Sequence, residues 1–532
     1  MKENSLRELA GWACGLRLGD IPRSVRERAV DQVLSTLAAV YSGWESDLGP
    51  GLERAYHPPA AGPARIIPTG AAAPASHAAM LMASWSMVLD FDDVMLGGHT
   101  GHSSVLTPLA IGSMGQTSGA DLLVAQIVAN EIAARINMVC AVGATRGQMA
   151  THLHLLAASA ARAKLEALDE DRFAEALGLA LSYPSQALFP AFMGSDAKAL
   201  CASLAVRVGM EAVDAAREGL RAAVGLLDEK KGFFATHARV PVREFLGGLG
   251  KRWHTETNSF KIYPVCGYVC SALDATLELV HSHEIPPGDV AAVDVWASMF
   301  TVGMDAHSAP YLDGPRSRVS TLTFSTPFTI ASAILAREFT PEQLKRSWIE
   351  KPEVWQLAAR VRSRHDFELT QRALTADIPI GAALRRTRPW QAGAFAWSAA
   401  GSALGKRDRW RNPDTYRLIA RLAAVAGDSS PLDFSKSTKP LGAHVEIHLS
   451  DGRTLGSAVS IPQGFAGAST GEGKPTVRDL MRRKFVNAAA AAIGHDQAQE
   501  MSDFLERLED LSAAEVSHLF EIGRVRAHAG VA

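Results

Sequence analysis

The sequence has few cysteines, and none is spaced for a structural cross-link or a zinc site. Only five occur among 532 residues: Cys14, Cys140, Cys201, Cys266 and Cys270. A sparse, odd set of cysteines argues against a disulfide framework and favours a reducing compartment. Cys266 and Cys270 lie four residues apart, which is not the C-x-x-C spacing of redox and zinc pairs.

Long apolar runs and an excess of positive charge are also missing. No uninterrupted apolar stretch reaches the roughly 18 residues that a membrane span needs. The first 21 residues alternate charged and apolar side chains and lack a signal-peptide core. The formal net charge of −2 gives no support for binding nucleic acid or an anionic membrane. These absences predict a cytoplasmic protein with no nucleic-acid partner and no membrane partner.

Alanine and other apolar residues are abundant, and their spacing is helical over most of the first half. Hydrophobic residues make up 47% and charged residues 21%, the balance of an ordinary globular protein. Helical periodicity runs through residues 24–41, 77–93, 120–140, 154–167, 172–181 and 198–224. Loops rich in proline and glycine separate these stretches. The sequence therefore predicts layered helices up to about residue 250.

The pattern changes after Pro264. Residues 290–304 alternate and contain β-branched side chains, which predicts a strand. Residues 445–449 and 455–461 flank an Asp451-Gly452 turn, which predicts a hairpin, and helices are expected near 326–337 and 352–361. The predicted fold class is mainly α. A large all-helical domain, residues 1–264 plus 466–532, carries an inserted smaller α+β lid domain, residues 265–465.

One short stretch concentrates the residues that suit proton chemistry. It runs Leu89-Asp90-Phe91-Asp92-Asp93 and then Gly97-Gly98-His99-Thr100-Gly101-His102-Ser103-Ser104. If the acids close a helix, Asp90 and Asp93 share one face of it. Ser103 or Ser104 would cap the next helix and place His102 at its N-terminus, where the helix dipole disfavours an imidazolium. A neutral imidazole beside an orienting carboxylate suits proton transfer.

Other interpretations of this stretch stay open at the level of the residues. Acids and histidines before a loop are often solvated surface side chains. The D-x-D-D order partly matches the DDxxD magnesium motif of helical prenyl-diphosphate enzymes, but the chain shows no convincing second metal motif. A zinc site at His99 and His102 lacks a clear third protein ligand. We therefore predict no metal site.

Several motifs, in order along the chain, resemble the MmgE/PrpD family. The family includes 2-methylcitrate dehydratases, cis-aconitate decarboxylases and an iminodisuccinate epimerase. Leu89–Asp93 resembles its L-D-F-D-D motif, residues 194–198 (G-S-D-A-K) its G-S-x-x-K, and residues 258–264 (N-S-F-K-I-Y-P) its N-S-x-K-x-Y-P. Residues 462–464 (P-Q-G) and 482–485 (R-R-K-F) resemble the linker and the helix that return the chain to its first domain. Phe324-Ser325 resembles an F-S pair of the lid.

The resemblance implies a homodimer whose active site lies between the helical domain and the lid. It implies no cofactor and a small-molecule carboxylate as substrate. In such a site, lysines hold carboxylates and stabilise an enediolate, while a histidine moves a proton. By correspondence with the family motifs, the predicted catalytic residues are Asp90, His102, Lys198 and Lys261.

A second set of residues is predicted to bind the substrate: Asp93, His99, Gln148, His152, Cys266, Arg318 and Phe328. Three of them mark departures from the family. Gln148 falls near a histidine of the family's H-P-T segment, Cys266 falls where decarboxylases carry a histidine, and Phe328 falls where a lid tyrosine is usual. Cys266 also suits a nucleophile beside Lys261, although a small buried hydrophobe is the commoner role for such a cysteine.

These departures remove imidazole and hydroxyl groups from the expected pocket. A less polar pocket prefers a substrate with fewer carboxylates or with an apolar portion. The sequence therefore predicts a cofactor-independent dehydratase or decarboxylase whose acid substrate is more apolar than 2-methylcitrate or cis-aconitate. An isomerase or epimerase acting by proton transfer is the next hypothesis. A non-catalytic family member that binds a carboxylate is the third.

Overall fold

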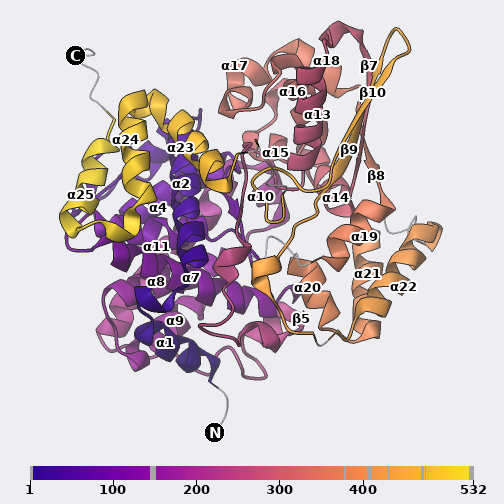
Figure 1. Ribbon diagram of the computed structural model, residues 1–532. Helices are drawn as coiled ribbons and strands as arrows, with labels where there is room; N and C mark the ends of the chain where they lie inside the picture. Colours follow the sequence, from indigo (N-terminus) through magenta and orange to yellow (C-terminus); the bar gives the residue numbers. More distant parts are fainter. Residues whose placement is uncertain are drawn as a thin grey trace. The chain divides into compact units, whose positions relative to one another are not determined.

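The computed structural model describes residues 4–143, 151–376, 379–403, 410–428, 430–468, 473 and 475–525. The chain forms two compact units (Figure 1). The first comprises Met1–Phe189, Ala197–Phe260 and Pro475–Ala532, and the second comprises Pro190–Asp196 and Lys261–Lys474. The predicted domains end at residues 264 and 465, whereas the units change after Phe260 and Lys474. Gln148 lies outside the described residues.

The first unit is built almost entirely from helices. They are α1 Ser5–Gly15, α2 Arg23–Trp44, α3 Gly49–Ala55, α4 Ala75–Val88, α5 Gly101–Ser104, α6 Leu106–Gly112, α7 Gly119–Val139, α8 His152–Leu165, α9 Glu170–Leu181, α11 Leu200–Arg217, α12 Phe233–His237, α23 Val477–Ile493, α24 His495–Glu506 and α25 Ala513–Ile522. Three two-stranded ladders join loops between them: β1 Ala64–Arg65 with β2 Ala72–Ala73, β3 Asp93–Val94 with β6 Ser259–Phe260, and β4 Val142–Gly143 with β5 Ala238–Val240.

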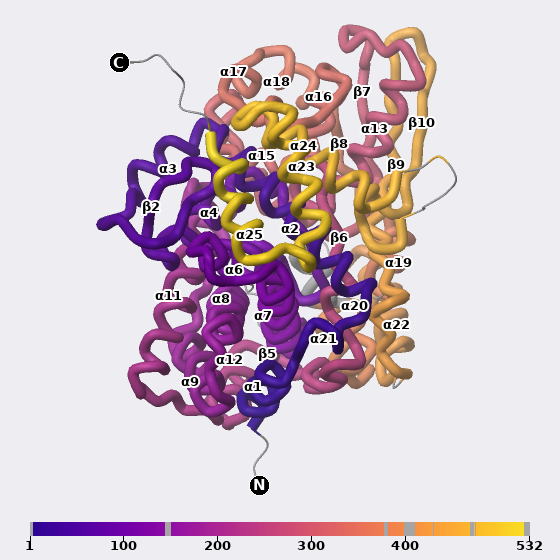
Figure 2. The backbone as a smooth tube through the Cα atoms, turned by 60° about the vertical axis from the view of Figure 1, so that its left-hand side comes forward, coloured from indigo at the N-terminus to yellow at the C-terminus, as the bar shows by residue number. Residues whose placement is uncertain are grey.

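Helix α7 lies in the core of this unit. Ser118 caps it by accepting a hydrogen bond from Asp121 N, and almost every residue that follows is buried. Its length and composition would allow it to cross a membrane, but 94% of its apolar window is buried within the structure. Helix α8 packs against α7, and α4 and α23 pack against α2. Figures 1 and 2 both show the yellow C-terminal helices beside the indigo α2.

The second unit contains a four-stranded mixed sheet and its own helices. The strands are β7 Val290–Ala297, β8 Val361–His365, β9 Ala443–Leu449 and β10 Thr454–Val459, in the order β10-β9-β7-β8. Only the β7–β8 pair is parallel. The helices are α13 Cys270–Ser282, α14 Met299–Ser308, α15 Val319–Leu322, α16 Thr326–Ala336, α17 Arg346–Ile349, α18 Pro352–Ala358, α19 Phe367–Thr375, α20 Pro379–Arg385, α21 Pro389–Ala403 and α22 Pro413–Val425. Helix α10, Phe189–Gly194, begins where the chain passes between the units.

The predicted fold class is confirmed: the protein is mainly helical, with a small mixed sheet in its C-terminal part. The hairpin at Asp451-Gly452 is also confirmed, and Gly452 takes a φ of 89° in its turn. The predicted strand over 290–304 is too long, because the strand ends at Ala297 and α14 starts at Met299. The short ladders of the first unit were not predicted, since two-residue strands have no detectable periodicity.

Candidate active site

The acidic stretch lies beyond helix α4 rather than on it, so the prediction that Asp90 and Asp93 share a helix face is wrong. Helix α4 ends at Val88, and Asp90 takes a left-handed φ of 55°. Aspartate is one of the few residues with a side chain that tolerates this conformation. Asp93 then enters strand β3, where its Cα pairs with that of Phe260. The chain therefore leaves the helix through a tight turn that separates the three carboxylates.

Asp93 is fully buried, and it ties this turn to the interior of the first unit. Its Oδ1 accepts a hydrogen bond from Gly101 N at 3.0 Å, and its Oδ2 accepts one from Gln32 Nε2 at 2.9 Å. Gln32 belongs to α2 and also donates to Thr100 Oγ1 at 3.0 Å. Asp93 thus joins the turn, α2 and the start of α5. Its predicted contact with substrate stays a prediction.

Asp90 and Lys198 form a buried ion pair. Lys198 Nζ donates to Asp90 Oδ1 at 2.6 Å, and the exposed fractions of the two side chains are 1% and 12%. A buried ammonium needs a negative partner, because desolvation otherwise penalises the charge by several kcal/mol. The structure therefore brings together two of the predicted catalytic residues that are 108 positions apart.

Asp92 holds two histidines on a single carboxylate oxygen. Its Oδ2 lies 2.6 Å from His99 Nδ1 and 3.1 Å from His102 Nε2. The His102 side chain is only 1% exposed, whereas that of His99 is 36% exposed. The predicted catalytic histidine is therefore buried, and the predicted substrate-binding histidine is the one that reaches solvent.

The far side of His102 is closed by two helices. Ser86 Oγ of α4 lies 2.7 Å from His102 Nδ1. The ring of His154, in α8, packs edge-on against that of His102 at 5.7 Å between centroids. His154 Nδ1 lies 3.0 Å from Ser103 Oγ. The pKa of His154 lies well below its ordinary value, mainly because the ring is buried and secondly because His102 is close. His154 is therefore neutral.

The prediction that Ser103 or Ser104 caps a helix is wrong. Helix α5 begins earlier, at Gly101, and both serine hydroxyls donate to Thr100 O at 3.0 Å. His102 nevertheless lies in the first turn of α5, as expected. Gly101 is required there, because a Cβ at this position would lie 2.3 Å from Asp93 Oδ1 and 2.4 Å from Thr36 Oγ1.

A buried ion pair in α7 positions the segment that leads to Lys261. Glu131 is paired with Arg135, and both side chains are essentially unexposed. Glu131 also accepts hydrogen bonds from His254 N at 3.0 Å and from Thr255 N at 2.9 Å. These bonds hold the start of the segment that becomes β6, the partner of β3. Lys261 follows β6 directly.

Lys484 ties the turn to the last part of the chain. This lysine, in α23, donates to Phe91 O at 2.7 Å and to Ser35 Oγ at 2.9 Å. Its ammonium also lies 3.9 Å from the centroid of the Phe91 ring. Lys484 therefore fixes Phe91, the residue between Asp90 and Asp92.

Four of the predicted site residues belong to the second unit. Lys261 is fully buried, and Cys266 is buried with its main-chain N donating to Thr323 O at 2.8 Å. Arg318 is half-exposed and pairs with Asp196 at 2.6 Å. Phe328 is fully buried, with its ring 5.7 Å from that of Trp355. The roles of Lys261, Cys266, Arg318 and Phe328 in binding or catalysis stay predictions.

His152 packs among aromatic rings of the first unit. Its ring centroid lies 4.9 Å from that of Phe233 and 5.7 Å from that of His237. Burial lowers the pKa of His152 to about 3, so the ring is neutral at physiological pH. These contacts suit a packing role, and its predicted contact with substrate remains untested.

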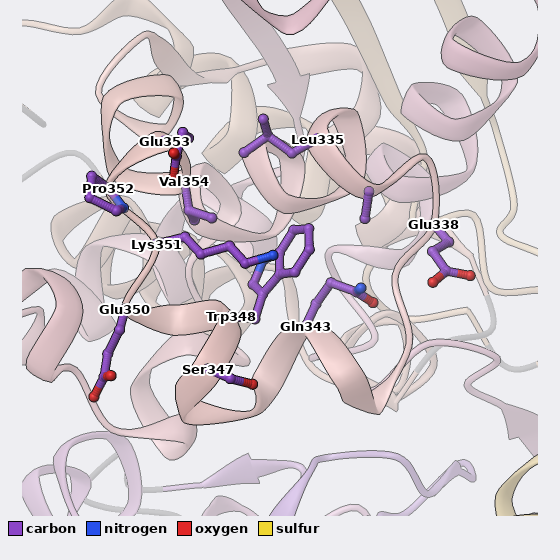
Figure 3. A pocket seen from close by; sticks show the side chains of 11 residues that line it. Leu335, Glu338, Gln343, Ser347, Trp348, Glu350, Lys351, Pro352, Glu353 and Val354 are labelled. Carbon is purple, nitrogen blue, oxygen red and sulfur yellow. The ribbon is translucent and has the colours of Figure 1, made fainter.

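Among the described residues, each unit contains a cavity whose lining includes none of the predicted catalytic residues. One, in the second unit, has a volume of about 760 Å³ and surrounds Trp348, whose ring lies 4.0 Å below Lys351 Nζ (Figure 3). Its other charged residues are glutamates, Glu338, Glu350 and Glu353, which would repel an acid.

The other cavity, in the first unit, has a volume of about 470 Å³ and contains Arg17 and Lys164. Both cations are already bonded to main-chain carbonyl groups. Lys164 Nζ donates to the carbonyls of Ala13 and Leu16 at 2.7 and 2.8 Å, and Arg17 Nη1 donates to that of Cys14 at 2.8 Å. Neither cavity is therefore a good site for a carboxylate substrate. Among the described residues, no group of three or more His, Cys, Asp or Glu side chains is arranged to hold a metal ion.

The helical first unit therefore holds a lysine–aspartate ion pair two residues from a carboxylate that contacts two imidazoles, and these are groups that suit acid–base chemistry. The chain belongs to the MmgE/PrpD family: residues 7–244 match the MmgE/PrpD N-terminal domain, and residues 263–387 match the MmgE/PrpD C-terminal domain. The predicted family is thereby confirmed.

Two proteins from Aspergillus species are similar over most of the chain. A cis-aconitate decarboxylase from Aspergillus terreus is 26% identical over 410 residues, covering 70% of this chain and 80% of the relative. The cis-aconitate decarboxylase-like protein oryM from Aspergillus oryzae is 22% identical over 550 aligned positions, covering 98% of this chain and 97% of the relative. At these identities the similarity establishes the family and not the substrate.

Sequence reasoning missed several residues of this site. Asp92 stood in the quoted motif but received no role, because its partners became evident only in three dimensions. Ser86 carried no signal, and His154 could equally have replaced the family histidine near Gln148 or packed within a helix, since the contacts of both depend on how α4, α5 and α8 pack. Asn258 also stands out: both of its side-chain amide atoms are buried and lack a hydrogen-bond partner within the described structure.

Proposed function

We propose that this protein is a cofactor-independent lyase that breaks a bond beside the carboxylate of a small organic acid. The observation that carries the proposal is the Asp92 carboxylate held against His99 and His102, two residues from the Asp90–Lys198 ion pair. Breaking such a bond leaves an electron pair next to a carboxylate. An ammonium stabilises that charge, and an imidazole moves the proton that completes the reaction.

Decarboxylation is the form of this chemistry that the relatives favour, because one is named a cis-aconitate decarboxylase and the other a cis-aconitate decarboxylase-like protein. In that reaction a C–C bond breaks, carbon dioxide leaves, and the electron pair left on carbon takes a proton from the enzyme. Dehydration is the alternative, and it needs the same lysine and a proton donor for the departing hydroxide. In this proposal Lys198 and Lys261 bind carboxylates and Asp90 orients Lys198.

We propose further that the substrate is more apolar than cis-aconitate. Cys266 and Phe328 stand where the family resemblance expects an imidazole and a phenol, and a site built without these groups recognises fewer polar substituents. An acid with an alkyl group in place of one carboxylate is expected to have a higher kcat/KM, since one methylene in a fitting pocket is worth about 10–200-fold. Equal or better turnover of cis-aconitate or 2-methylcitrate would refute this part. The homodimer and the cytoplasmic location remain predictions.

The experiment is an NMR screen in deuterated water with a panel of small carboxylic acids, from citrate-like to alkyl-substituted. Product formation or deuterium exchange is expected with at least one acid. Lys198→Met is expected to lower kcat/KM about 100- to 1,000-fold, the usual loss when one charge-stabilising donor is removed. Lys164→Met is the matched control, because this lysine bonds main-chain carbonyls elsewhere in the first unit. Equal activity of both variants would contradict the assignment of Lys198.

The same screen separates the remaining alternatives. Deuterium incorporation at one carbon without loss of water or carbon dioxide would identify an isomerase or epimerase. If no acid reacts but one protects the protein against unfolding, the chain is a carboxylate-binding member of the family, because a ligand that binds only the folded state raises its stability.

A further inference from the structure

His102 is enclosed to a degree that does not suit the group that meets the substrate. Its side chain is 1% exposed. Both of its ring nitrogens are engaged, Nδ1 at 2.7 Å from Ser86 Oγ and Nε2 at 3.1 Å from Asp92 Oδ2. To reach a substrate, either nitrogen would first give up a buried hydrogen bond, which costs about 1–3 kcal/mol.

The hydrogen bonds around His102 are complete in both of its protonation states. Ser86 Oγ lies 2.7 Å from His102 Nδ1 and donates to Ala83 O at 2.9 Å, but a hydroxyl has one proton to give. When His102 is neutral, with its proton on Nε2, the hydroxyl donates to Nδ1. When His102 is an imidazolium, Nδ1 donates to Ser86 and the hydroxyl donates to Ala83 O. His102 can therefore gain or lose a proton without leaving a buried group unsatisfied.

Asp92 connects this buried ring to His99. One oxygen, Oδ2, lies within hydrogen-bond distance of both imidazoles, and the Asp92 side chain is 4% exposed. Through this oxygen the two rings belong to one hydrogen-bonded chain, along which a proton can pass between them. Because the His99 side chain is 36% exposed, it is the member of the pair that can exchange that proton with a substrate or with water.

Three polar groups next to the pair are neutral or hydrogen-bonded to other groups. His154 is neutral, because burial keeps its pKa well below the ordinary value. Asp93 has its two oxygens on Gly101 N and Gln32 Nε2. Lys484 donates to Phe91 O and to Ser35. The Asp92 carboxylate and its two imidazoles thus form one hydrogen-bonded group inside the first unit.

We infer that His99, rather than His102, delivers the proton to the substrate. Asp92, His102 and Ser86 are positioning residues that orient His99 and help to return a proton to it. This inference rests on the proposed lyase function. In the step, the carbon that has lost carbon dioxide takes the proton from His99, and the His99 imidazolium becomes neutral. A proton from water, or the one held by His102, then restores it.

The test compares His99→Ala with His102→Ala, using the acid that the wild-type protein turns over best. His99→Ala is expected to lower kcat about 100-fold or more with little change in KM. Free imidazole is expected to restore part of that activity, since the deleted ring reached solvent. The exposed His57→Ala is the matched control and is expected to behave as wild type. A rise in KM alone for His99→Ala, or rescue of His102→Ala instead, would overturn the inference.

A second measurement tests whether His99 and His102 share a proton, and it does not require turnover of a substrate. The ring ¹⁵N shifts of His99 are followed through a pH titration of the full-length protein, in wild type, His102→Gln and Asp92→Asn. A shared proton predicts that the His99 midpoint moves in both variants. An unchanged midpoint in both would refute the sharing even if the protein is an active lyase. Moved midpoints in a protein that transforms no acid would refute the proposed function and leave the proton pair established.

Discussion

At the scale of single residues, Asp90 combines a charge requirement with a backbone requirement. Its φ of 55° is left-handed, and its carboxylate pairs with the buried Lys198. Most side chains pay about 1–2 kcal/mol in this conformation, whereas asparagine and aspartate tolerate it. The position therefore selects aspartate for two independent reasons, and substitutions can separate them.

Asp90→Ala is expected to be less stable than Asp90→Asn by about 1 kcal/mol, because both lose the ion pair but only alanine adds the backbone strain. Urea denaturation measures the difference. Ala167 provides a matched control, since it has a φ of 51° and no part in the site. Ala167→Gly is expected to gain a similar amount without a change in activity. Equal stability of Asp90→Ala and Asp90→Asn would show that the turn relaxes at no cost.

At the scale of elements, the join between strand β3 and helix α5 depends on a close approach at Gly101. A Cβ there would meet Asp93 Oδ1 and Thr36 Oγ1 at less than 2.5 Å, and both groups are buried. Gly101→Ala is expected to cost about 1–3 kcal/mol, the usual penalty of overpacking, and to lower activity by moving His102. Gly303, inside α14, has open space around it, so Gly303→Ala is expected to gain about 0.5–1 kcal/mol. Thermal unfolding measures the stability of both variants. Equal losses of stability in the two would contradict the steric argument.

At the scale of the whole molecule, a buried carboxyl links the beginning and the end of the long segment that forms the second unit. Asp274, in α13, accepts hydrogen bonds from Tyr263 OH and from Gln463 N, both at 2.8 Å. Burial raises the pKa of Asp274 to about 6. A carboxyl whose pKa is higher in the folded state stabilises the fold most at low pH, and this contribution is lost as the pH rises through about 6.

Asp274→Asn keeps a neutral side chain at every pH, with an oxygen for Gln463 N and an amide that can donate to Tyr263. Its free energy of unfolding relative to wild type is therefore expected to improve by about 2 kcal/mol between pH 4.5 and 7.5. Denaturant unfolding at the two pH values measures this change. Because other titrating groups are common to both proteins, parallel pH profiles would show that Asp274 keeps an ordinary pKa when folded.

How far the sequence could predict this molecule also depends on scale. Helical periodicity located α2 and α16, and the Asp451-Gly452 pair located the hairpin, because these signals are local. The motifs identified the family and placed Asp90 and Lys198 in one site. The left-handed turn at Asp90 was missed, since the apolar pattern of α4 continues to Leu89. The grouping of Ser86, Asp92 and His102 was missed because it arises from packing between segments, which no local pattern encodes.

The bond from Lys484 to Phe91 O spans 393 residues of chain, and this has a consequence for biosynthesis. A ribosome adds roughly 5–20 residues per second, so the turn that carries Asp90 and Asp92 is made about 20–80 s before the helix that secures it. Any translation product that stops before α23 lacks this bond, whatever the state of its earlier helices. The order of synthesis thus separates the turn from the residue that fixes it, and the turn takes its final hydrogen bonds only after α23 has been made.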